Sequence, residues 1–556
     1  MNPSFDIGAE GQSYKNFLIT RYLPLPELQS TLIEAVHHPS GARILQIANS
    51  DPENLFCLSF QTLPTSSNGV AHILEHMVLC GSRKYPVKDP FFAMNRRSLN
   101  TFMNAFTGQD FTAYPASSQV EVDFYNLLSV YVDAIFHPEL KKISFLQEGH
   151  RLSFESGEVL KLQGVVYNEM KGAMASADSR LWRRLFAALY PGLPYAYNSG
   201  GDPQEISRLT HEELIAFHKE FYHPSRCLFF FYGNLPLCKH LDFLAEHVLH
   251  DVKQLAPLPP LSMEPKVDVP QAIVASYPIA PFESLDKRSI VALAWLTAPV
   301  THQEELLAIS LLNSLLLEHD ASPLRKALLK SGLLLQVSSA LDTQIAIAPW
   351  VILCKGCNPE DADKIRALIY TTCAEIAESP FPQEEIEASL HQFEFERSEV
   401  NGDEGPFGLT LFFRAGLLAQ QGVDPETALS IHHLFANLRR RCEDPQFLSG
   451  LLRRTLLDNR HCIQLTMKPD PTLEAREADE EKEALAALQE KLTSEEKERI
   501  IRDDEALATY LEETENQDLS SLPKLELKDI PPHIADFPLT REKRGDLHLF
   551  HHSCFT

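Results

Sequence analysis

The segment from Asn68 to Gly81 constrains the fold of this chain more than any other, because its pattern predicts a helix with two unlike faces. At 100° per residue, four apolar side chains fall on one face: Val70, Ile73, Leu74 and Met77. The opposite face carries His72, Glu75 and His76. Such a helix buries its apolar face in a core and leaves its polar face open to a cavity.

The polar face of this helix has the residue types and spacing of a metal site. His72 and His76 are one helical turn apart, so their imidazoles can reach the same ion. Glu75 projects between them, close to the ion but free to act on a water molecule. The pattern is H-x-x-E-H, an inverted zinc-peptidase motif. The alternative is a surface helix that spells the motif by chance, since a motif alone is only a hypothesis.

Size and charge narrow the classes of function. The 556 residues are enough for about three or four domains. A net charge of −26 argues against nucleic acid or an anionic membrane as the main partner. An acidic field favours basic peptides, although it can also serve solubility alone. No apolar run reaches the ~18 residues of a membrane span, so we expect no membrane partner.

The cysteines and the N-terminal residues indicate the compartment. Ten cysteines are scattered without a regular framework, and the first 17 residues lack the apolar core of a signal peptide. We therefore expect reduced thiols and an intracellular protein, in the cytoplasm of a bacterium or the organelle matrix of a eukaryote. Cys354 and Cys357 form one C-x-x-C without a second pair, which favours ordinary thiols over a redox or zinc role.

The order of predicted elements indicates an α+β fold with two similar α/β domains, each an antiparallel sheet with packed helices. We expect a first domain at 1–258 and a second at 270–468, separated by a cluster of prolines. In the first domain we predict strands at 43–47 and 56–61, a β-hairpin over 99–114, and helices at 122–136, 164–190 and 212–222. In the second we predict strands at 289–295, 333–339 and 345–353, and helices at 303–317, 360–378 and 383–400.

The C-terminal region differs in composition. Two Glu/Lys/Ala/Leu-rich segments, 475–492 and 494–513, predict a charged helical hairpin that acts as a spacer over residues 469–530. Thr493 and Glu496 form a capping box at the start of its second helix. Residues 531–556 are expected to begin another strand-containing region.

Several segments in order resemble one family, and the resemblance runs from about residue 15 to the end of the chain. The zinc motif lies within GVAHILEHMVLCGSRKY, and later segments read DFYNLLSVYVD, GVVYNEMKG and SGGDP. Together they resemble the pitrilysin/insulinase family of inverted-motif zinc metallopeptidases, in its presequence-protease branch. The resemblance implies a clamshell peptidase, of which this chain would be the N-terminal half plus the helical linker.

The resemblance also implies roles for single residues. His72 and His76 would bind one Zn²⁺ per chain, Glu75 would be the general base toward the attacking water, and Glu169 would be the third ligand. Spacing alone does not choose Glu169, because it lies far along the chain from His76. Other downstream carboxylates are open as alternatives on spacing: Glu148, Glu155 and Glu158.

A second set of matched positions concerns the substrate. Asn104, Ala105 and Phe106 match the edge strand that lies beside the zinc in the family. A peptide can add to such an edge through main-chain hydrogen bonds, which hold the scissile bond while reading little sequence. The alternative for Asn104 is an ordinary residue of a turn or sheet edge.

The function implied is a zinc metalloendopeptidase that degrades short unstructured peptides, of the presequence type or similar, inside a closed chamber. In the family, a second half contributes an Arg and a Tyr near the zinc, and this chain ends at Thr556, where that half would begin. We therefore expect a C-terminal half as partner, in cis or in trans. The alternatives are a zinc-holding half that binds peptides with little turnover, and a structural subunit of a larger peptidase.

Overall fold

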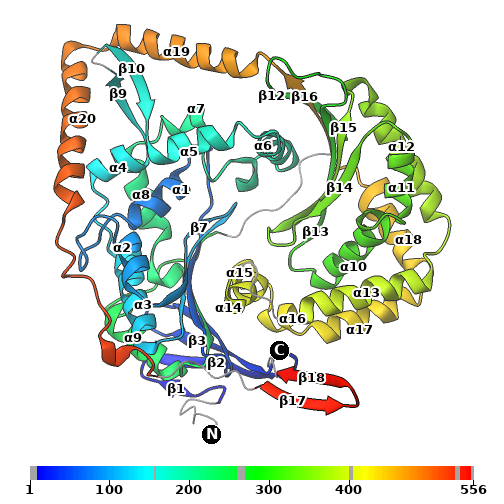
Figure 1. The fold of residues 1–556 in the computed structure, drawn as a ribbon, viewed down its shortest axis with the longest axis horizontal. Coiled ribbons are helices and arrows are strands. Elements are labelled where there is room, and N and C mark those ends of the chain that lie inside the picture. The colour runs from blue at the N-terminus through cyan, green and yellow to red at the C-terminus, as the bar shows by residue number, and fades with distance from the viewer. Residues whose placement is uncertain (1–8, 156–157, 260–268, 400–404, 533–538, 553–556) are drawn as a thin grey trace.

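The computed structural model describes residues 9–155, 158–259, 269–399, 405–532 and 539–552. It contains two large sheets with packed helices, two long helices that run around the outside, and a C-terminal hairpin (Figure 1). The predicted α+β class is confirmed. No helix within the described residues is both long and apolar enough to cross a membrane.

The first sheet has nine strands in the order β1-β2-β3-β4-β11-β5-β8-β6, with β7 also paired to β8. Its strands are β1 (Ser13–Tyr14), β2 (Phe17–Leu25), β3 (Ser30–His37), β4 (Arg43–Ala48), β5 (Asn54–Gln61), β6 (Asn100–Met103), β7 (Phe106–Thr107), β8 (Phe111–Ser118) and β11 (Cys227–Gly233). All pairs are antiparallel except β4 with β11. Four helices share a core with one face of this sheet: α1 (Val70–Val78), α3 (Glu121–Phe136), α8 (His211–Phe221) and α9 (Leu237–His247).

Strand β11 explains why the sheet carries helices on both faces. All seven of its residues are buried, so its side chains cannot alternate between core and water. Phe229 and Phe231 join the core that contains α1 and α3. Leu228 and Phe230 join a core on the other face, built largely by helices from the second half of the chain.

The second sheet has five strands in the order β12-β16-β13-β15-β14, and only β12 and β16 are parallel. The strands are β12 (Gln271–Pro278), β13 (Ser289–Pro299), β14 (Gln336–Leu341), β15 (Ile347–Cys357) and β16 (Cys462–Asp470). In both sheets an early strand, β4 or β12, runs parallel to the last strand, which then pairs antiparallel with β5 or β13. The predicted likeness of the two α/β units is therefore present in their topology.

The helices that follow the second sheet in the chain pack beside it (Figure 1). They are α10 (Gln303–Asn313), α11 (Pro323–Lys330), α12 (Ala362–Ala377), α13 (Gln383–Ser398), α17 (Ile431–Cys442) and α18 (Phe447–Leu452). The predicted helix at 303–317 ends in a π-helical turn, Ser314–Glu318.

The two units exchange helices across their boundary. Helix α6 (Ala177–Leu189) precedes the second sheet in sequence but packs on it, with Leu181 and Leu185 in one core with Ala292 and Val351. Conversely, α14 (Phe407–Leu411) and the π-helical turn after it pack on the first sheet, where the Phe412 and Phe230 rings lie 5.5 Å apart. Each sheet therefore borrows part of its cover from the other unit.

Two predicted elements of the first unit are wrong in detail. The single helix at 164–190 is two helices, α5 (Val165–Ala173) and α6, because Ser176 ends the first and caps the second with its hydroxyl. The hairpin over 99–114 has an interrupted first arm: β6 and β7 are separated by Asn104 and Ala105, while β8 continues to Ser118. Between these elements lie α4 (Lys142–Glu148), β9 (Arg151–Glu155) and β10 (Val159–Gln163).

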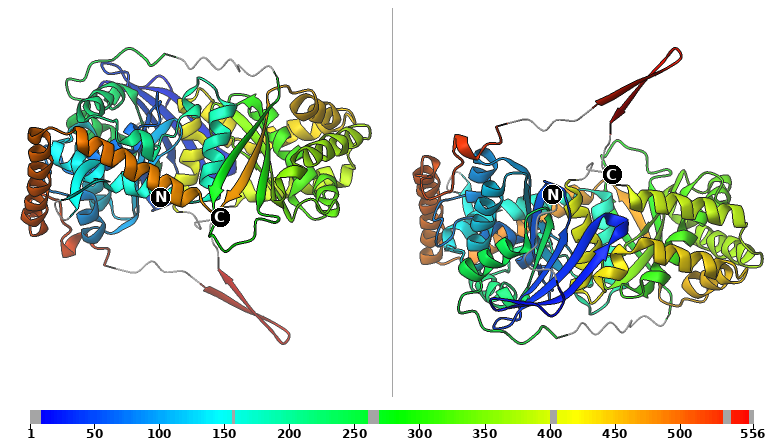
Figure 2. Two further views of the ribbon diagram at one scale, coloured as in Figure 1. Left: turned by 90° about the horizontal axis from the view of Figure 1, so that it is seen from above. Right: turned by 90° about the horizontal axis from the view of Figure 1, so that it is seen from below.

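The charged segments form the two predicted helices, α19 (Leu473–Lys491) and α20 (Ser494–Glu515), and the capping box at Thr493 is present. They do not lie side by side as a hairpin. Figure 1 shows α19 along the top of the molecule and α20 down its left side, so together they form a strap. The last described strands, β17 (Leu539–Arg544) and β18 (Leu547–His552), pair as a hairpin that stands away from the body (Figure 2).

Candidate metal centre

Helix α1 places the H-x-x-E-H residues as its two faces require. The apolar face is buried, with Ile73, Leu74 and Met77 fully inaccessible to solvent. The opposite face keeps His72 and His76 partly exposed, and their rings lie 5.0 Å apart in an edge-to-face arrangement. Burial of one face therefore fixes the direction in which both imidazoles point.

Helix α5 brings Glu169 to the two histidines. Its Oε2 lies 3.9 Å from His72 Nε2 and 3.9 Å from His76 Nε2. Among the described residues, these three form the group whose ligand atoms all lie within 4.8 Å of one another. Glu155 and Glu158 are not part of the group.

The three residues fit a zinc ion. A His₂Glu set with one open position is typical of catalytic zinc, and tetrahedral bonds of ~2.1 Å would separate the ligand atoms by about 3.4 Å. The observed 3.9 Å separations need to contract only slightly. The Glu169 side chain is 55% exposed, so it has room to make that adjustment.

Hydrogen bonds to the far side of each ring fix the tautomer that metal binding needs. His72 Nδ1–H donates to the carbonyl oxygen of Gly200 at 3.2 Å, and His76 Nδ1–H donates to Glu148 Oε2 at 3.1 Å. The Nε2 lone pair of each ring is then directed toward Glu169. Partners of this kind orient metal-binding histidines and raise their basicity.

Glu148 therefore has a place in the site, although not as a ligand. It closes helix α4, is largely buried, and contacts His76 from behind. Burial disfavours a charged His76 ring, but the hydrogen bond to Glu148 and the charges of Glu75 and Glu169 outweigh it and raise the pKa of His76. The sequence offered Glu148 only as one of several downstream carboxylates, and nothing in its spacing from His76 distinguished this role.

Glu75 has a partner that sequence reasoning also missed. The hydroxyl of Thr107, on strand β7, donates to Glu75 Oε2 at 2.5 Å. This bond links the motif helix to the strand beside it and orients the carboxylate. Thr107 follows the predicted substrate residues directly, which is the one signal that could have drawn attention to it.

The predicted substrate residues lie at the edge of the first sheet. Asn104 and Ala105 form the break between β6 and β7, where Asn104 N–H donates to the carbonyl oxygen of Pro115. Phe106 begins β7, pairs with Ala113, and lies near the Phe413 ring. Among the described strands, β6 and β7 pair only with β8, so their outer side faces no other strand.

Comparison with known proteins identifies the chain's relatives. Residues 64–185 match the family Insulinase (Peptidase family M16), residues 208–393 match the Peptidase M16 inactive domain, and residues 467–556 match a region associated with peptidases of subgroup C of that family. The chain is 37% identical to Presequence protease, mitochondrial, of Xenopus laevis over 97% of its own length and 53% of the relative's. It is 35% identical to Presequence protease 1, chloroplastic/mitochondrial, of Arabidopsis thaliana, over 96% and 50%. The chain thus spans about half the length of these curated relatives.

Solved structures agree at the level of fold. A protease from Helicobacter pylori has a TM-score of 0.59 at 18% identity and covers 77% of this chain, with 98% of its own length matched. A peptidase M16 inactive domain from Pseudomonas fluorescens has a TM-score of 0.57 at 17% identity, over 77% and 96%. With its three matched regions and its relatives named presequence protease, this chain belongs to the insulinase (M16) family of peptidases, in the presequence-protease branch.

Proposed function

We propose that this chain binds one Zn²⁺ through His72, His76 and Glu169 and, with it, hydrolyses peptide bonds in short unstructured peptides. The observation that carries the proposal is the convergence of His72 Nε2, His76 Nε2 and Glu169 Oε2 beside Glu75. When bound, zinc supplies Lewis acidity, which lowers the pKa of water toward ~7 and polarises a carbonyl group.

Glu75 is the proposed general base. Its place on the same helix face as both histidines puts it beside the metal without making it a ligand. One carboxylate oxygen is held by Thr107, which leaves the other to take the proton of the attacking water. Glu75 then returns that proton to the leaving amine.

The outer side of β6–β7 is the proposed substrate site, with Asn104, Ala105 and Phe106 as its contacts. A free sheet edge binds an extended chain through backbone hydrogen bonds, so it selects for flexibility more than for sequence. Peptides of the presequence type, to which the names of the relatives refer, meet that requirement. A stably folded protein offers no extended segment to pair with the edge.

The remaining parts of the chain have supporting roles in this proposal. Residues 1–258 form the catalytic domain, 270–468 a second domain without metal ligands, 469–530 the linker, and 531–556 the start of a further region. A second half, in cis or in trans, would close a chamber over the site and exclude water. Because the chain spans about half of its relatives, the competing proposal is a zinc-holding half that binds peptides with little turnover.

Metal content and peptide cleavage test the proposal together. The wild-type chain should bind one zinc and cut a quenched fluorogenic peptide. Glu75→Gln should keep the zinc and lose ~10²–10⁴ in rate, as expected for loss of a general base. Glu169→Gln should bind zinc more weakly, while the matched control Glu158→Gln should not. An empty site in Glu75→Gln, or zinc loss in Glu158→Gln alone, would contradict these assignments.

A further inference from the structure

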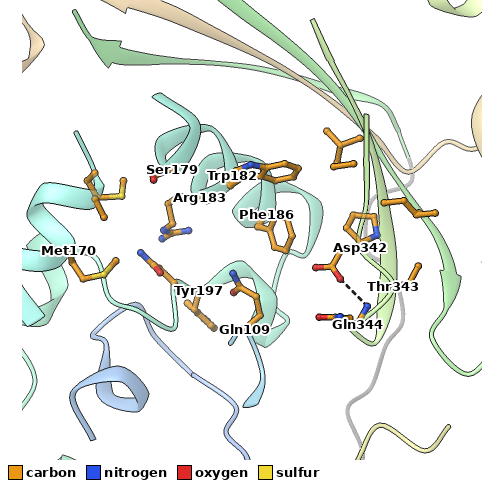
Figure 3. Close-up of a pocket in the computed structure, with 17 residues that line it drawn as sticks. Gln109, Met170, Ser179, Trp182, Arg183, Phe186, Tyr197, Asp342, Thr343 and Gln344 are labelled. Atoms are coloured by element: carbon orange, nitrogen blue, oxygen red, sulfur yellow. Dashed lines mark hydrogen bonds between the residues drawn. The ribbon is translucent and has the colours of Figure 1, made fainter. Parts of the chain in front are cut away.

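A cavity of about 740 Å³ lies beside the candidate metal centre and between the two units of the chain. Met170, the residue after Glu169, lines one part of it, and the turn Asp342–Gln344, after β14, lines another (Figure 3). Gln109, two residues after Thr107, also lines it. A side chain of a peptide on the β6–β7 edge would therefore find this cavity next to the metal ligands.

The walls of the cavity suit a long aliphatic side chain. Met170 and Met174 contribute thioethers, and Trp182 and Phe186 contribute rings that lie 5.9 Å apart in an edge-to-face arrangement. Thioethers and aromatic rings adapt to unbranched chains, and ring faces also attract a cation. The walls alone do not choose between an apolar guest and the stem of a basic one.

The polar groups of the cavity make that choice. Arg183 lines it but is already satisfied: its Nε donates to both oxygens of Asp202 at 2.9–3.0 Å, and its other nitrogens reach Ser67 and Ala196. Asp342 accepts one hydrogen bond, from the backbone N–H of Gln344. Within the described ranges, no lysine or arginine forms an ion pair with Asp342.

Asp342 is also surrounded in a way that favours a cation. Burial raises its pKa, and it in turn acts on the pKa of the neighbouring Asp110, so two carboxyl groups lie close together there. Gln109 Oε1 is buried and has no hydrogen-bond partner among the described residues. The cavity thus offers a carboxylate and an amide oxygen that both lack a donor from a guest.

We propose that this cavity is a specificity pocket that takes the side chain of an arginine in the bound peptide. The aliphatic stem lies against Trp182 and Phe186, and the guanidinium donates to Asp342 and Gln109. Arginine fits better than lysine, because its planar head has five donors, pairs bidentately with a carboxylate and stacks on aromatic rings. The inference rests on the proposed function, since it assumes a peptide on the β6–β7 edge.

Trp182 gives a direct readout. The chain has three tryptophans, and the other two, Trp295 and Trp350, are fully buried elsewhere. In a Glu75→Gln background, which prevents turnover, a peptide with arginine at the right position should shift the emission of Trp182. Anisotropy of the labelled peptide measures the same binding in Trp182→Phe, where the emission change should be lost but the affinity largely kept.

The peptide pair that isolates the charge is arginine against citrulline, which has the same shape and no charge, scanned through each position. At one position the arginine peptide should bind about tenfold or more tightly, as expected for a charge-assisted hydrogen bond. Asp342→Asn should bring that ratio close to one, and Gln109→Met should reduce it. Asp363→Asn, a matched change on the exposed α12, should leave it unchanged. A ratio near one at every position, or one that Asp342→Asn leaves intact, overturns the pocket.

The proposed function and the pocket fail separately. If wild-type chain with zinc cleaves none of these peptides, the peptidase proposal fails, whatever the binding ratio. If it cleaves them but neither binding nor KM responds to Asp342→Asn in an arginine-dependent way, the pocket fails and the peptidase proposal stands.

Discussion

Asp110 gives the sharpest physical prediction that the structure allows. The residue is 2% exposed, and its Oδ2 accepts hydrogen bonds from Tyr195 Oη at 2.7 Å and Gln421 Nε2 at 2.9 Å. Its Oδ1 has no partner among the described residues. Burial, with a contribution from the nearby Asp342, raises the pKa of Asp110 to about 6 despite these two bonds.

The sign of the effect follows from that direction. A carboxyl group whose pKa is higher in the folded state stabilises the fold in its protonated form. Its contribution is complete below the ordinary pKa of 3.8 and is lost as the pH rises through about 6. A raised pKa of about 2 units corresponds to ~3 kcal/mol of lost stability at neutral pH, as an upper figure.

Asp110→Asn should recover this stability, because asparagine keeps an oxygen for Tyr195 and Gln421 but carries no charge. For a chain of this length, ~2 cal/mol/K per residue gives about 1 °C in Tm per kcal/mol, so the variant should melt ~2–3 °C above wild type at pH 8. The difference should vanish near pH 4. Differential scanning calorimetry at several pH values measures both, with Asp363→Asn as control. A variant that melts below wild type at pH 8, or a difference that does not change with pH, would refute the reasoning.

Three further outcomes are expected. Glu148→Gln should weaken zinc binding by ~10–100-fold in a competition titration, because His76 loses its carboxylate partner; unchanged affinity would remove Glu148 from the site. Thr107→Val should lower kcat of the zinc-loaded chain about tenfold with little change in KM, and Thr107→Ser should restore it, since the hydroxyl orients Glu75; equal losses in both variants would point to packing instead. Addition of the C-terminal half of a curated relative should raise kcat/KM by ~10² or more, if closing the chamber and adding one oxyanion donor act as in other enzymes; equal rates would mean that this chain works alone.

The sequence could predict the elements whose cause is local. The two faces of α1 follow from helical periodicity, and the capping box at Thr493 follows from four residues. The resemblance named Glu169, which spacing could not, since α5 and α1 meet only through the tertiary fold. Glu148 and Thr107 were out of reach for the same reason: each contacts the motif helix from another element.

The errors have the opposite cause, because they depend on what each segment packs against. The apolar pattern of 164–190 continues through the break at Ser176, since α5 packs in the first unit while α6 packs on the second sheet. The predicted helical hairpin lacked a partner in the prediction. In the structure, Ile500 and Leu507 of α20 are buried, and the strap runs along the body instead of folding on itself.

The strap has a consequence for the metal site. Helix α5 buries only Val166 and Tyr167, so little of its own surface holds it in the core. Glu481 of α19 supplies an outside hold: it accepts from the Tyr167 hydroxyl at 2.7 Å and pairs with Lys171 at 2.5 Å, two residues to either side of Glu169. One metal ligand is thus suspended between the body and a segment more than 300 residues away in sequence. Slack in that distant segment reaches the ion as freedom of a single carboxylate, while the two histidines stay fixed by the core beneath them.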